Sequence, residues 1–399
     1  MKKHLITGGT GFIGRYLVRA LIRRGDMVFV LVREESNKNL DSVFGKLMDS
    51  KRLIFVFGDI RFNNLKIHRV YLKKLKNLKV DFVWHLAADL SMSLTKGKIN
   101  RHKTNINGTR NVINLANYIG AQLCHFSTIH VRGDAKGLSE DQLNVGQTFG
   151  NDYELSKFKA EEIVRKNAKV AYVIFRPGNV IGQAPIEKSV NCTMGYHRFI
   201  FIFYLIKCWF VHSLKYRKFM GGLLKIFGAR LSGDGKSISL PFLVIPYAKG
   251  VVQNFVPIEY VVSASLKIAN NKKAQNMTFH LTHPKSPPYV VMLKAMFEDL
   301  SFKKIKYMGV NAQLFEWIFK VIYLVALPWR GYVESFLIYI SYLKTNDNFS
   351  RLNTNSFNTP PKPISRNYFK SVNRRAFDKE YQKIDLKSAN IKIYKLLQR

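Results

Sequence analysis

The chain has 399 residues, of which 47% are hydrophobic and 23% are charged, a composition typical of a globular protein with an apolar core. Lysine and arginine total 64 against 26 aspartates and glutamates, a formal net charge of +38. This excess attracts polyanions such as phosphorylated cofactors, acidic carrier proteins and anionic lipid. Because no zinc-finger spacing or RNA-binding motif accompanies it, nucleic acid is not an expected partner. A basic surface that binds nothing is the alternative.

The cysteines and the first residues bear on location. Cys124, Cys192 and Cys208 are odd in number and form no Cys-x-x-Cys motif, which argues against a disulfide scaffold. Met1–His4 leads directly into an apolar stretch and leaves no room for a signal peptide. We therefore expect a cytoplasmic protein.

A glycine-rich loop opens the chain. Leu5–Gly14 runs from an apolar lead-in into three glycines at Gly-x-x-Gly-x-x-Gly spacing, and apolar residues then recur at helical spacing over 16–22. Strand, glycine turn and helix in this order are the context of a dinucleotide-binding loop, where the helix N-terminus faces the pyrophosphate. A glycine turn without a ligand is the alternative. The residues predicted to bind the cofactor here are Gly8, Thr10, Gly11, Phe12, Ile13 and Gly14.

The end of the second predicted strand, Met27–Val32, bears on the choice of cofactor. In NAD-using folds an acidic residue at this position holds the ribose 2′-hydroxyl, but here Val32 is followed by Arg33. A guanidinium suits a 2′-phosphate, so we expect NADPH rather than NADH. An ordinary surface arginine is the alternative, and Glu34 and Glu35 next to it weaken the case.

Two further strand ends are predicted to contact the cofactor. A third strand begins at Leu53 and runs into Asp59 and Ile60; Asp59 is placed near the adenine ring or in a simple strand-end turn. A fourth strand from Phe82 closes in the small residues Ala87 and Ala88, which allow a cofactor to lie against the backbone. His85 lacks a second ligand at a useful spacing, so we expect no metal site.

Three later segments carry the remaining motifs. Asn105 opens a predicted helix, and Ser127-Thr128 ends the strand Gln122–Phe126. Tyr153 and Lys157 lie four apart on a predicted helix that begins near Asn151, so they share one helix face. The last strand, Val170–Phe175, leads into Arg176–Gly182.

In this order, the motifs within 1–182 resemble an extended short-chain dehydrogenase/reductase. The resemblance implies an α/β fold, a Rossmann-type doubly wound parallel sheet with a smaller C-terminal substrate region. It adds Pro177, Gly178 and Val180 to the expected cofactor contacts. A looser resemblance of Asn254–Val261 and Thr278–Pro284 points to the thioester reductase and fatty acyl-CoA reductase branch.

The chemistry of hydride transfer explains the expected catalytic residues. Reduction of a carbonyl leaves an alkoxide that needs a proton donor, a role for Tyr153. Because a phenol titrates near 10, it needs a nearby cation, which Lys157 supplies; this lysine also suits the nicotinamide ribose. Thr128, or Ser127 beside it, would donate a second hydrogen bond, and Asn105 would hold a water or carbonyl in a proton relay. A chance Tyr-x-x-x-Lys pair on a helix surface is the alternative.

The second half is described mainly by composition. We expect a Rossmann domain over 1–190, a substrate region over 191–345 that returns one strand to the core, and a basic extension over 346–399 with a short helix near Ile384–Leu397. Apolar stretches at 199–214 and 314–343 interrupted by charges fit core helices, an acyl tunnel, or peripheral contact with an anionic membrane better than a membrane span.

The predicted function is NADPH-dependent reduction of an acyl thioester, on coenzyme A or an acidic acyl carrier protein, to an aldehyde or alcohol. A first alternative is an NAD-dependent epimerase/dehydratase or sterol-type dehydrogenase acting on a nucleotide sugar or lipid alcohol. A second is a non-catalytic dinucleotide-binding scaffold.

Overall fold

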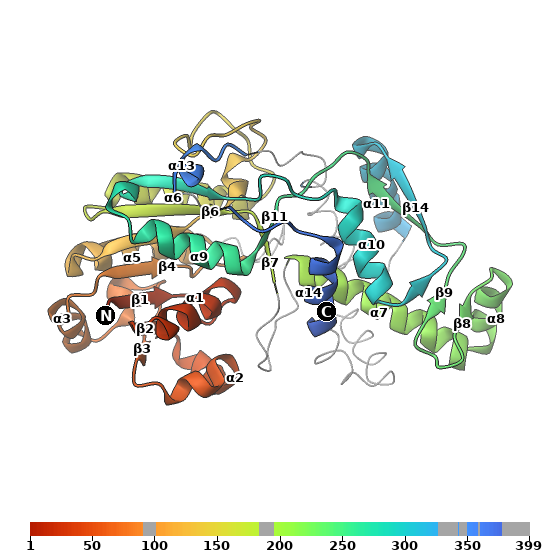
Figure 1. Cartoon of the computed structure of the whole chain (residues 1–399), viewed down its shortest axis with the longest axis horizontal. Coiled ribbons are helices and arrows are strands. Elements are labelled where there is room, and N and C mark those ends of the chain that lie inside the picture. Colours follow the sequence, from red (N-terminus) through yellow and green to blue (C-terminus); the bar gives the residue numbers. More distant parts are fainter. Residues whose placement is uncertain (91–100, 183–194, 326–341, 343–348, 358–359, 377–399) are drawn as a thin grey trace. The chain divides into compact units, whose positions relative to one another are not determined.

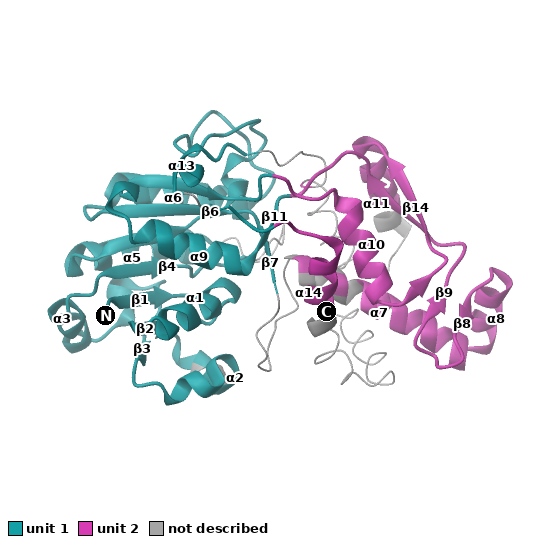
Figure 2. Ribbon diagram, in the orientation of Figure 1, with its two compact units in different colours: residues 1–190, 254–284, 348–362 teal, residues 191–253, 285–347, 363–399 magenta. Residues whose placement is uncertain are grey.

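The chain forms two compact units, each built from several separate segments (Figure 2). The computed structural model describes residues 1–90, 101–182, 195–325, 342, 349–357 and 360–376. Unit 1 comprises 1–190, 254–284 and 348–362, and unit 2 comprises 191–253, 285–347 and 363–399. The segment predicted as one extension over 346–399 is divided between the units, with 348–362 in unit 1 and 363–399 in unit 2.

Unit 1 is built on a seven-stranded sheet in the order β12-β6-β5-β4-β1-β2-β3, and all of its neighbouring strands are parallel. The predicted Rossmann-type fold is confirmed. The strand order reverses between β1 and β4, the switch point at which such sheets bind ligands. The strands are β1 (Lys3–Thr7), β2 (Met27–Val32), β3 (Leu53–Phe57), β4 (Phe82–His85), β5 (Gln122–Phe126), β6 (Tyr172–Pro177) and β12 (Met277–Leu281).

Helices cover both faces of this sheet (Figure 1). Alternate residues of a strand point to opposite faces; Ile6 of β1 joins the core beneath α1, α2 and α9, whereas Leu5 joins the core beneath α3, α5 and α6. Both faces are buried, which explains the nearly continuous apolar runs of the strands. The helices are α1 (Phe12–Arg23), α2 (Leu40–Phe44), α3 (Arg69–Asn77), α5 (Gly108–Ile119), α6 (Asp152–Asn167) and α9 (Ile258–Ala269).

The edge strand β12 is covered by the segment that returns from the later part of the chain. In this segment α13 (Leu352–Ser356) packs against β12, and the Asn353 side chain donates to the Thr278 carbonyl at 3.1 Å. Covering the unpaired backbone of an edge strand prevents it from pairing with another chain. Beyond the main sheet, β7 (Asn179–Ile181) pairs in parallel with β11 (Phe255–Pro257).

Unit 2 combines apolar helices with two small sheets. The sheets are β13-β9-β8 and β10-β14. Phe297 lies in its core, in ring contact with Phe203, Phe302 and Tyr307. The elements are α7 (Gly195–Tyr216), α8 (Lys218–Ile226), β8 (Arg230–Leu231), β9 (Ile238–Ser239), β10 (Val244–Ala248), α10 (Tyr289–Asp299), β13 (Phe302–Lys303), β14 (Lys306–Val310), α11 (Ala312–Val325) and α14 (Arg366–Ala376).

The apolar stretches noted in the sequence fall mostly on helices of unit 2. The stretch 199–214 lies within α7, and the start of 314–343 lies within α11. Nearly all of 326–343, and the helix expected near 384–397, lie outside the described residues. No helix in the described ranges has both the length and the apolar content needed to traverse a bilayer.

Candidate active site

The glycine loop forms a tight turn between β1 and α1. Gly8 has a φ of +73°, and a Cβ atom there would lie 2.5 Å from the Ala87 nitrogen. A Cβ on Gly14 would lie 2.2 Å from the Gly8 carbonyl oxygen. Only glycine tolerates these two positions, because a left-handed backbone and direct contact with another backbone exclude larger residues.

The first turn of α1 has the features of a phosphate site. Gly11 is the N-cap of α1, and within the described residues no side chain caps this end and no acid lies in the first turn. The N–H groups of this first turn point out of the helix, where an anion can accept from them. Phe12 and Ile13 pack partly against the core, which orients the turn. These residues fit the pyrophosphate of a dinucleotide.

Four charged side chains meet at the ends of β2 and β3. Arg33 is exposed and lies 3.8 Å from Glu35. Asp59 accepts from the Arg61 backbone nitrogen at 2.9 Å and from its guanidinium at 2.5–3.1 Å. Burial opposes ionisation of Asp59, but the bonds from Arg61 outweigh it and lower the pKa of this carboxyl. Arg61 was not predicted from the sequence, although an arginine two residues after an aspartate at a strand end is a recognisable signal.

Two of the other predicted cofactor contacts lie at the same edge of the sheet. Ala87 and Ala88 follow β4 and are half-buried. Ile60 instead packs in the core, where a Cβ on Gly108 would lie 2.8 Å from its side chain. The strand predicted to reach Ile60 ends earlier, at Phe57.

The segment Pro177–Val180 is held by a residue from much later in the chain. The Asn254 carbonyl accepts from the Asn179 nitrogen at 2.7 Å, and its side-chain amide bonds the His283 backbone in both directions. A Cβ on Gly178 would lie 2.6 Å from the Asn254 oxygen. Asn254 is therefore the residue that fixes this loop.

The helix α6 carries Tyr153 and Lys157 in buried positions. Its N-cap Asn151 accepts from the Glu154 nitrogen at 3.0 Å, and the Glu154 carboxylate accepts from Gly150 at 2.9 Å, so the cap fixes the start of the helix. Tyr153 is 8% exposed and Lys157 is 4% exposed. The alternative of an ordinary pair on a helix surface does not describe them.

Lys157 joins α6 to the end of β5. Its ammonium donates to the Phe126 carbonyl at 2.6 Å, next to Ser127 and Thr128, which are both buried. Burial lowers the pKa of Lys157 to about 8, and Glu161 partly opposes this shift. Lys157 therefore brings α6, which also carries Tyr153, to the end of β5, where Ser127 and Thr128 follow.

Asn105 lies in a π-helix (His102–Asn107) that precedes α5, not at the opening of an α-helix as predicted. Its side-chain oxygen accepts from the Asp89 nitrogen at 2.7 Å. Its amide nitrogen donates to the Asp89 carbonyl at 3.0 Å and to the Ser156 hydroxyl at 2.9 Å. Both amide hydrogens are thereby used, and Asn105 ties α6 to the loop after β4.

A buried hydrogen-bond chain links this π-helix to the glycine loop. The Thr109 hydroxyl donates to the Asn105 carbonyl at 2.6 Å, so it accepts from His85 Nε2 at 3.0 Å. His85 Nδ1 then accepts from the Thr7 hydroxyl at 2.7 Å. Burial lowers the pKa of His85 to about 3, which keeps it neutral for this chain of bonds.

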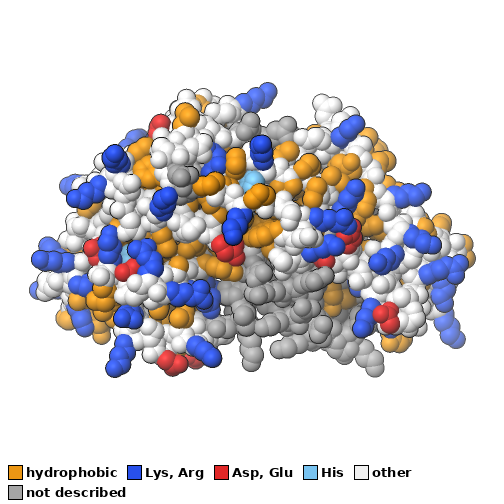
Figure 3. Space-filling view, in the orientation of Figure 1, with side chains coloured by type: hydrophobic (Ala, Val, Ile, Leu, Met, Phe, Trp, Pro, Cys, Tyr) orange, Lys and Arg blue, Asp and Glu red, His pale blue; other side chains and the backbone are white. Residues whose placement is uncertain are grey.

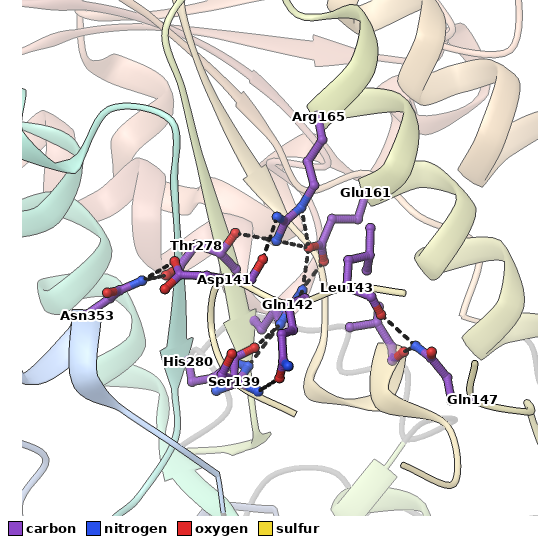
Figure 4. Close-up of polar contacts among 12 residues, drawn as sticks. Ser139, Asp141, Gln142, Leu143, Gln147, Glu161, Arg165, Thr278, His280 and Asn353 are labelled. Carbon is purple, nitrogen blue, oxygen red and sulfur yellow. Dashed lines mark hydrogen bonds and ion pairs between the residues drawn. The ribbon is translucent and has the colours of Figure 1, made fainter. Parts of the chain in front are cut away.

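A second buried network anchors the other end of α6 (Figure 4). Glu161 forms an ion pair of 2.6 Å with Arg176, and both side chains are completely buried. Arg165 also binds Glu161 at 3.0 Å and reaches the Thr278 hydroxyl at 2.8 Å. Arg176 donates to the carbonyls of Ser139 and Gln142. The network joins α6, β6, β12 and the loop before α6, and none of its members was singled out for this role from the sequence.

The chain is similar to several known proteins. Residues 6–216, more than half of the chain, match the family described as Male sterility protein. UDP-glucuronic acid decarboxylase 1 of Arabidopsis thaliana is 36% identical over 131 residues, which cover 33% of this chain and 27% of the relative. Adenylate-forming reductase Nps11 of Serpula lacrymans var. lacrymans is 24% identical over 323 residues, 74% of this chain and 25% of the relative.

A solved structure extends the similarity to nearly the whole chain. The terminal R domain from the myxalamid PKS-NRPS biosynthetic pathway has a TM-score of 0.69 at 19% identity, over 94% of this chain and 90% of that chain. This likeness shows a shared fold. The aligned stretches span only about a quarter of the length of the two curated relatives. Because the family model matches residues 6–216, the chain belongs to the Male sterility protein family. This family lies within the extended short-chain dehydrogenase/reductases, which are NAD(P)-dependent enzymes.

Proposed function

We propose that this protein is an NADPH-dependent oxidoreductase that reduces an acyl thioester to an aldehyde. The observation that carries the reductase chemistry is the buried pair Tyr153 and Lys157, with the lysine bonded at the end of β5 beside Thr128. The choice of an acyl thioester as substrate is supported by the similarity to the adenylate-forming reductase Nps11, which extends over 74% of the chain. The fold shared with the terminal R domain of a PKS-NRPS pathway also supports this choice.

The residues of unit 1 supply the proton and the stabilisation that reduction needs. When bound, NADPH supplies a hydride to the thioester carbonyl carbon. Thr128 and Tyr153 donate hydrogen bonds to the resulting alkoxide, and Tyr153 gives it a proton. As the C–S bond then breaks, the hydroxyl returns its proton to the Tyr153 phenolate, which leaves the aldehyde, and the departing thiolate takes up a proton from water. Lys157 is cationic below about pH 8 and stabilises the phenolate formed at Tyr153.

The preference for NADPH rests on Arg33. Its contact with Glu35 is long and exposed, and such pairs contribute little, so a 2′-phosphate would displace Glu35 readily. Arg61 is already committed to Asp59. Arg33→Ala should therefore raise KM for NADPH and leave KM for NADH unchanged, whereas the exposed Arg52→Ala should change neither. An equal effect of both substitutions would remove Arg33 from cofactor selection.

The substrate is tested by following NADPH absorbance with acyl-coenzyme A thioesters of increasing chain length. Tyr153→Phe should lower kcat by about 100- to 10,000-fold, because it removes the proton donor. Tyr118→Phe, an exposed tyrosine on α5, is the matched control. A panel with no thioester-dependent oxidation would contradict the proposal, and full turnover by Tyr153→Phe would exclude that residue from the mechanism.

An acidic acyl carrier protein is the proposed natural thioester carrier, because a net charge of +38 attracts it at long range. Its kcat/KM should exceed that of the matching acyl-coenzyme A at low salt and fall steeply as salt is added. Equal salt dependence for both substrates would argue against a carrier.

A nucleotide-sugar dehydratase or epimerase is the second candidate, favoured by the 36% identity to a UDP-glucuronic acid decarboxylase. The same Tyr153 and Lys157 would then act on a sugar hydroxyl, with NAD retained through the cycle. Incubation with UDP-sugars and product analysis distinguishes the two candidates. Turnover of a UDP-sugar without net NAD(P)H consumption would favour this alternative.

A further inference from the structure

The most unusual surface of unit 2 lies on α8 and its flanks. Every exposed side chain from 215 to 230 is either apolar or cationic. Phe219 and Ile226 are each 80% exposed. We name this surface the α8 patch; it consists of Lys215, Tyr216, Arg217, Lys218, Phe219, Leu223, Lys225, Ile226, Phe227 and Arg230.

The apolar members of the α8 patch form one face of a helix. Phe219, Leu223 and Ile226 are four and three residues apart, and Phe227 extends the row, so these side chains lie side by side. The opposite face holds α8 against α7, because Gly221 and Leu224 are buried there. A Cβ on Gly221 would lie 2.6 Å from the Ser213 carbonyl oxygen. This close contact holds α8 with its apolar face outward.

The charge around the α8 patch is predominantly positive. Between Asn191 and Gln253 the chain contains nine lysines and arginines but only one acid, Asp234. Lysine and arginine side chains crowd the end of unit 2 that carries α8 (Figure 3). A partner that complements this surface must be negatively charged and must also accept bulky apolar side chains.

An anionic lipid surface meets both requirements. A helix with Phe, Leu and Ile on one face and lysines beside them inserts its apolar face into the headgroup region, while the lysines bind anionic headgroups. A protein partner fits less well, because lysine is depleted from protein interfaces. The described side chains over 196–214 of α7, which include the predicted apolar stretch, are buried or half-buried.

We propose that the α8 patch docks this protein on the surface of an anionic membrane. Phe219, Ile226 and Phe227 enter the interface, and Lys218 and Lys225 bind the lipid headgroups. The docking is peripheral and independent of the reaction assigned to unit 1. It places the enzyme where long-chain lipid substrates or products reside.

Flotation of the full chain with liposomes tests this proposal. Vesicles of phosphatidylcholine alone are compared with vesicles that contain about a third phosphatidylserine. The protein should float with the anionic vesicles only, and salt should weaken the binding. The triple substitution Phe219→Ser, Ile226→Ser and Phe227→Ser should lower the bound fraction by about tenfold, as should Lys218→Glu with Lys225→Glu.

A matched control lies on α3 of unit 1, which is also basic and exposes Val70 and Tyr71. Val70→Ser with Tyr71→Ser should leave flotation within about twofold of the wild type. Circular dichroism of each variant verifies that it is folded. Equal losses in the α3 and α8 variants would overturn the proposal. So would a wild type that does not float but forms a dimer that the α8 substitutions dissociate.

Discussion

Unit 1 and unit 2 differ in which side chains they bury and which they expose. In unit 1 the ion pair Glu161–Arg176 is completely buried and anchors the helix that carries Tyr153 and Lys157. In unit 2 the ion pair Glu298–Arg366 is on the surface, with side chains 38% and 51% exposed, while apolar side chains of α8 face outward. The active-site frame thus buries polar groups, whereas the second unit exposes apolar ones.

Each of these features has a free-energy cost, and the cost indicates what the feature is for. Burying a charge pair is costly unless all of its partners are in place, so the network around Glu161 makes the geometry of α6 dependent on β6, β12 and the preceding loop. Exposing an apolar face is also unfavourable in water, and such patches mark interaction surfaces. Catalysis needs the first property and membrane docking uses the second.

The largest expected effect comes from breaking the buried pair. Glu161→Gln leaves Arg176 charged and buried without its partner, so it should destabilise unit 1 by about 3–5 kcal/mol. The matched change in unit 2, Glu298→Gln, removes an exposed pair and should cost at most about 1 kcal/mol. Hydrogen exchange of β5 and β6 peptides, beside that of α10 peptides, measures each unit separately.

A double variant sharpens this test. Glu161→Leu with Arg176→Met removes both charges and should recover part of the stability lost in Glu161→Gln. If Glu161→Gln accelerates exchange in β5 and β6 no more than Glu298→Gln accelerates it in α10, the two ion pairs do not differ in their contribution to stability.

The titration of Lys157 gives a smaller and pH-dependent effect. Burial lowers the pKa of Lys157 to about 8 in the folded state from its ordinary value of 10.5. The folded protein therefore binds fewer protons between these values, and its stability rises with pH from about 8 to 10.5. Relative to Lys157→Met, the wild type should gain about 3 kcal/mol across this interval.

Urea denaturation at several pH values measures this difference, with Lys225→Met on the exposed surface of α8 as the control. The structure indicates that Lys157 is desolvated. If the difference in unfolding free energy between the wild type and Lys157→Met stays constant with pH, this desolvation is contradicted.

The smallest expected effects on stability come from replacing one glycine in each unit by alanine. Gly8→Ala forces a side chain onto a backbone with φ of +73° and against Ala87, so it should cost at least about 1–2 kcal/mol and weaken dinucleotide binding. In α8, a Cβ at Gly222 meets no heavy atom of the described chain within 4 Å. Gly222→Ala should therefore stabilise unit 2 by about 0.5–1 kcal/mol. Thermal unfolding of both variants, with dinucleotide titration of Gly8→Ala, checks the opposite signs.

Several features of the active site could be predicted because their signals are local. The glycine spacing from Gly8 to Gly14 and the Tyr153–Lys157 interval each lie within one or two elements. Asn105 was recognised as part of the site, but its bonds to Asp89 and Ser156 join segments whose proximity the sequence does not encode locally. Asp59 was predicted without Arg61, because apolar periodicity locates the end of a strand, whereas only the two-residue spacing from aspartate to arginine indicates their bond.

The sequence by itself determined the alternation of strands and helices, and thereby the parallel sheet with its cofactor edge, since buried strands and amphipathic helices carry distinct periodicities. Only the tertiary structure decided which buried charges meet, as in Glu161–Arg176, and which apolar faces stay outside, as in α8. Both outcomes depend on contacts between distant segments. The described side chains in the apolar run of α7 are buried or half-buried, whereas one face of the shorter α8 is exposed, because burial is a property of the packed fold and not of hydropathy alone.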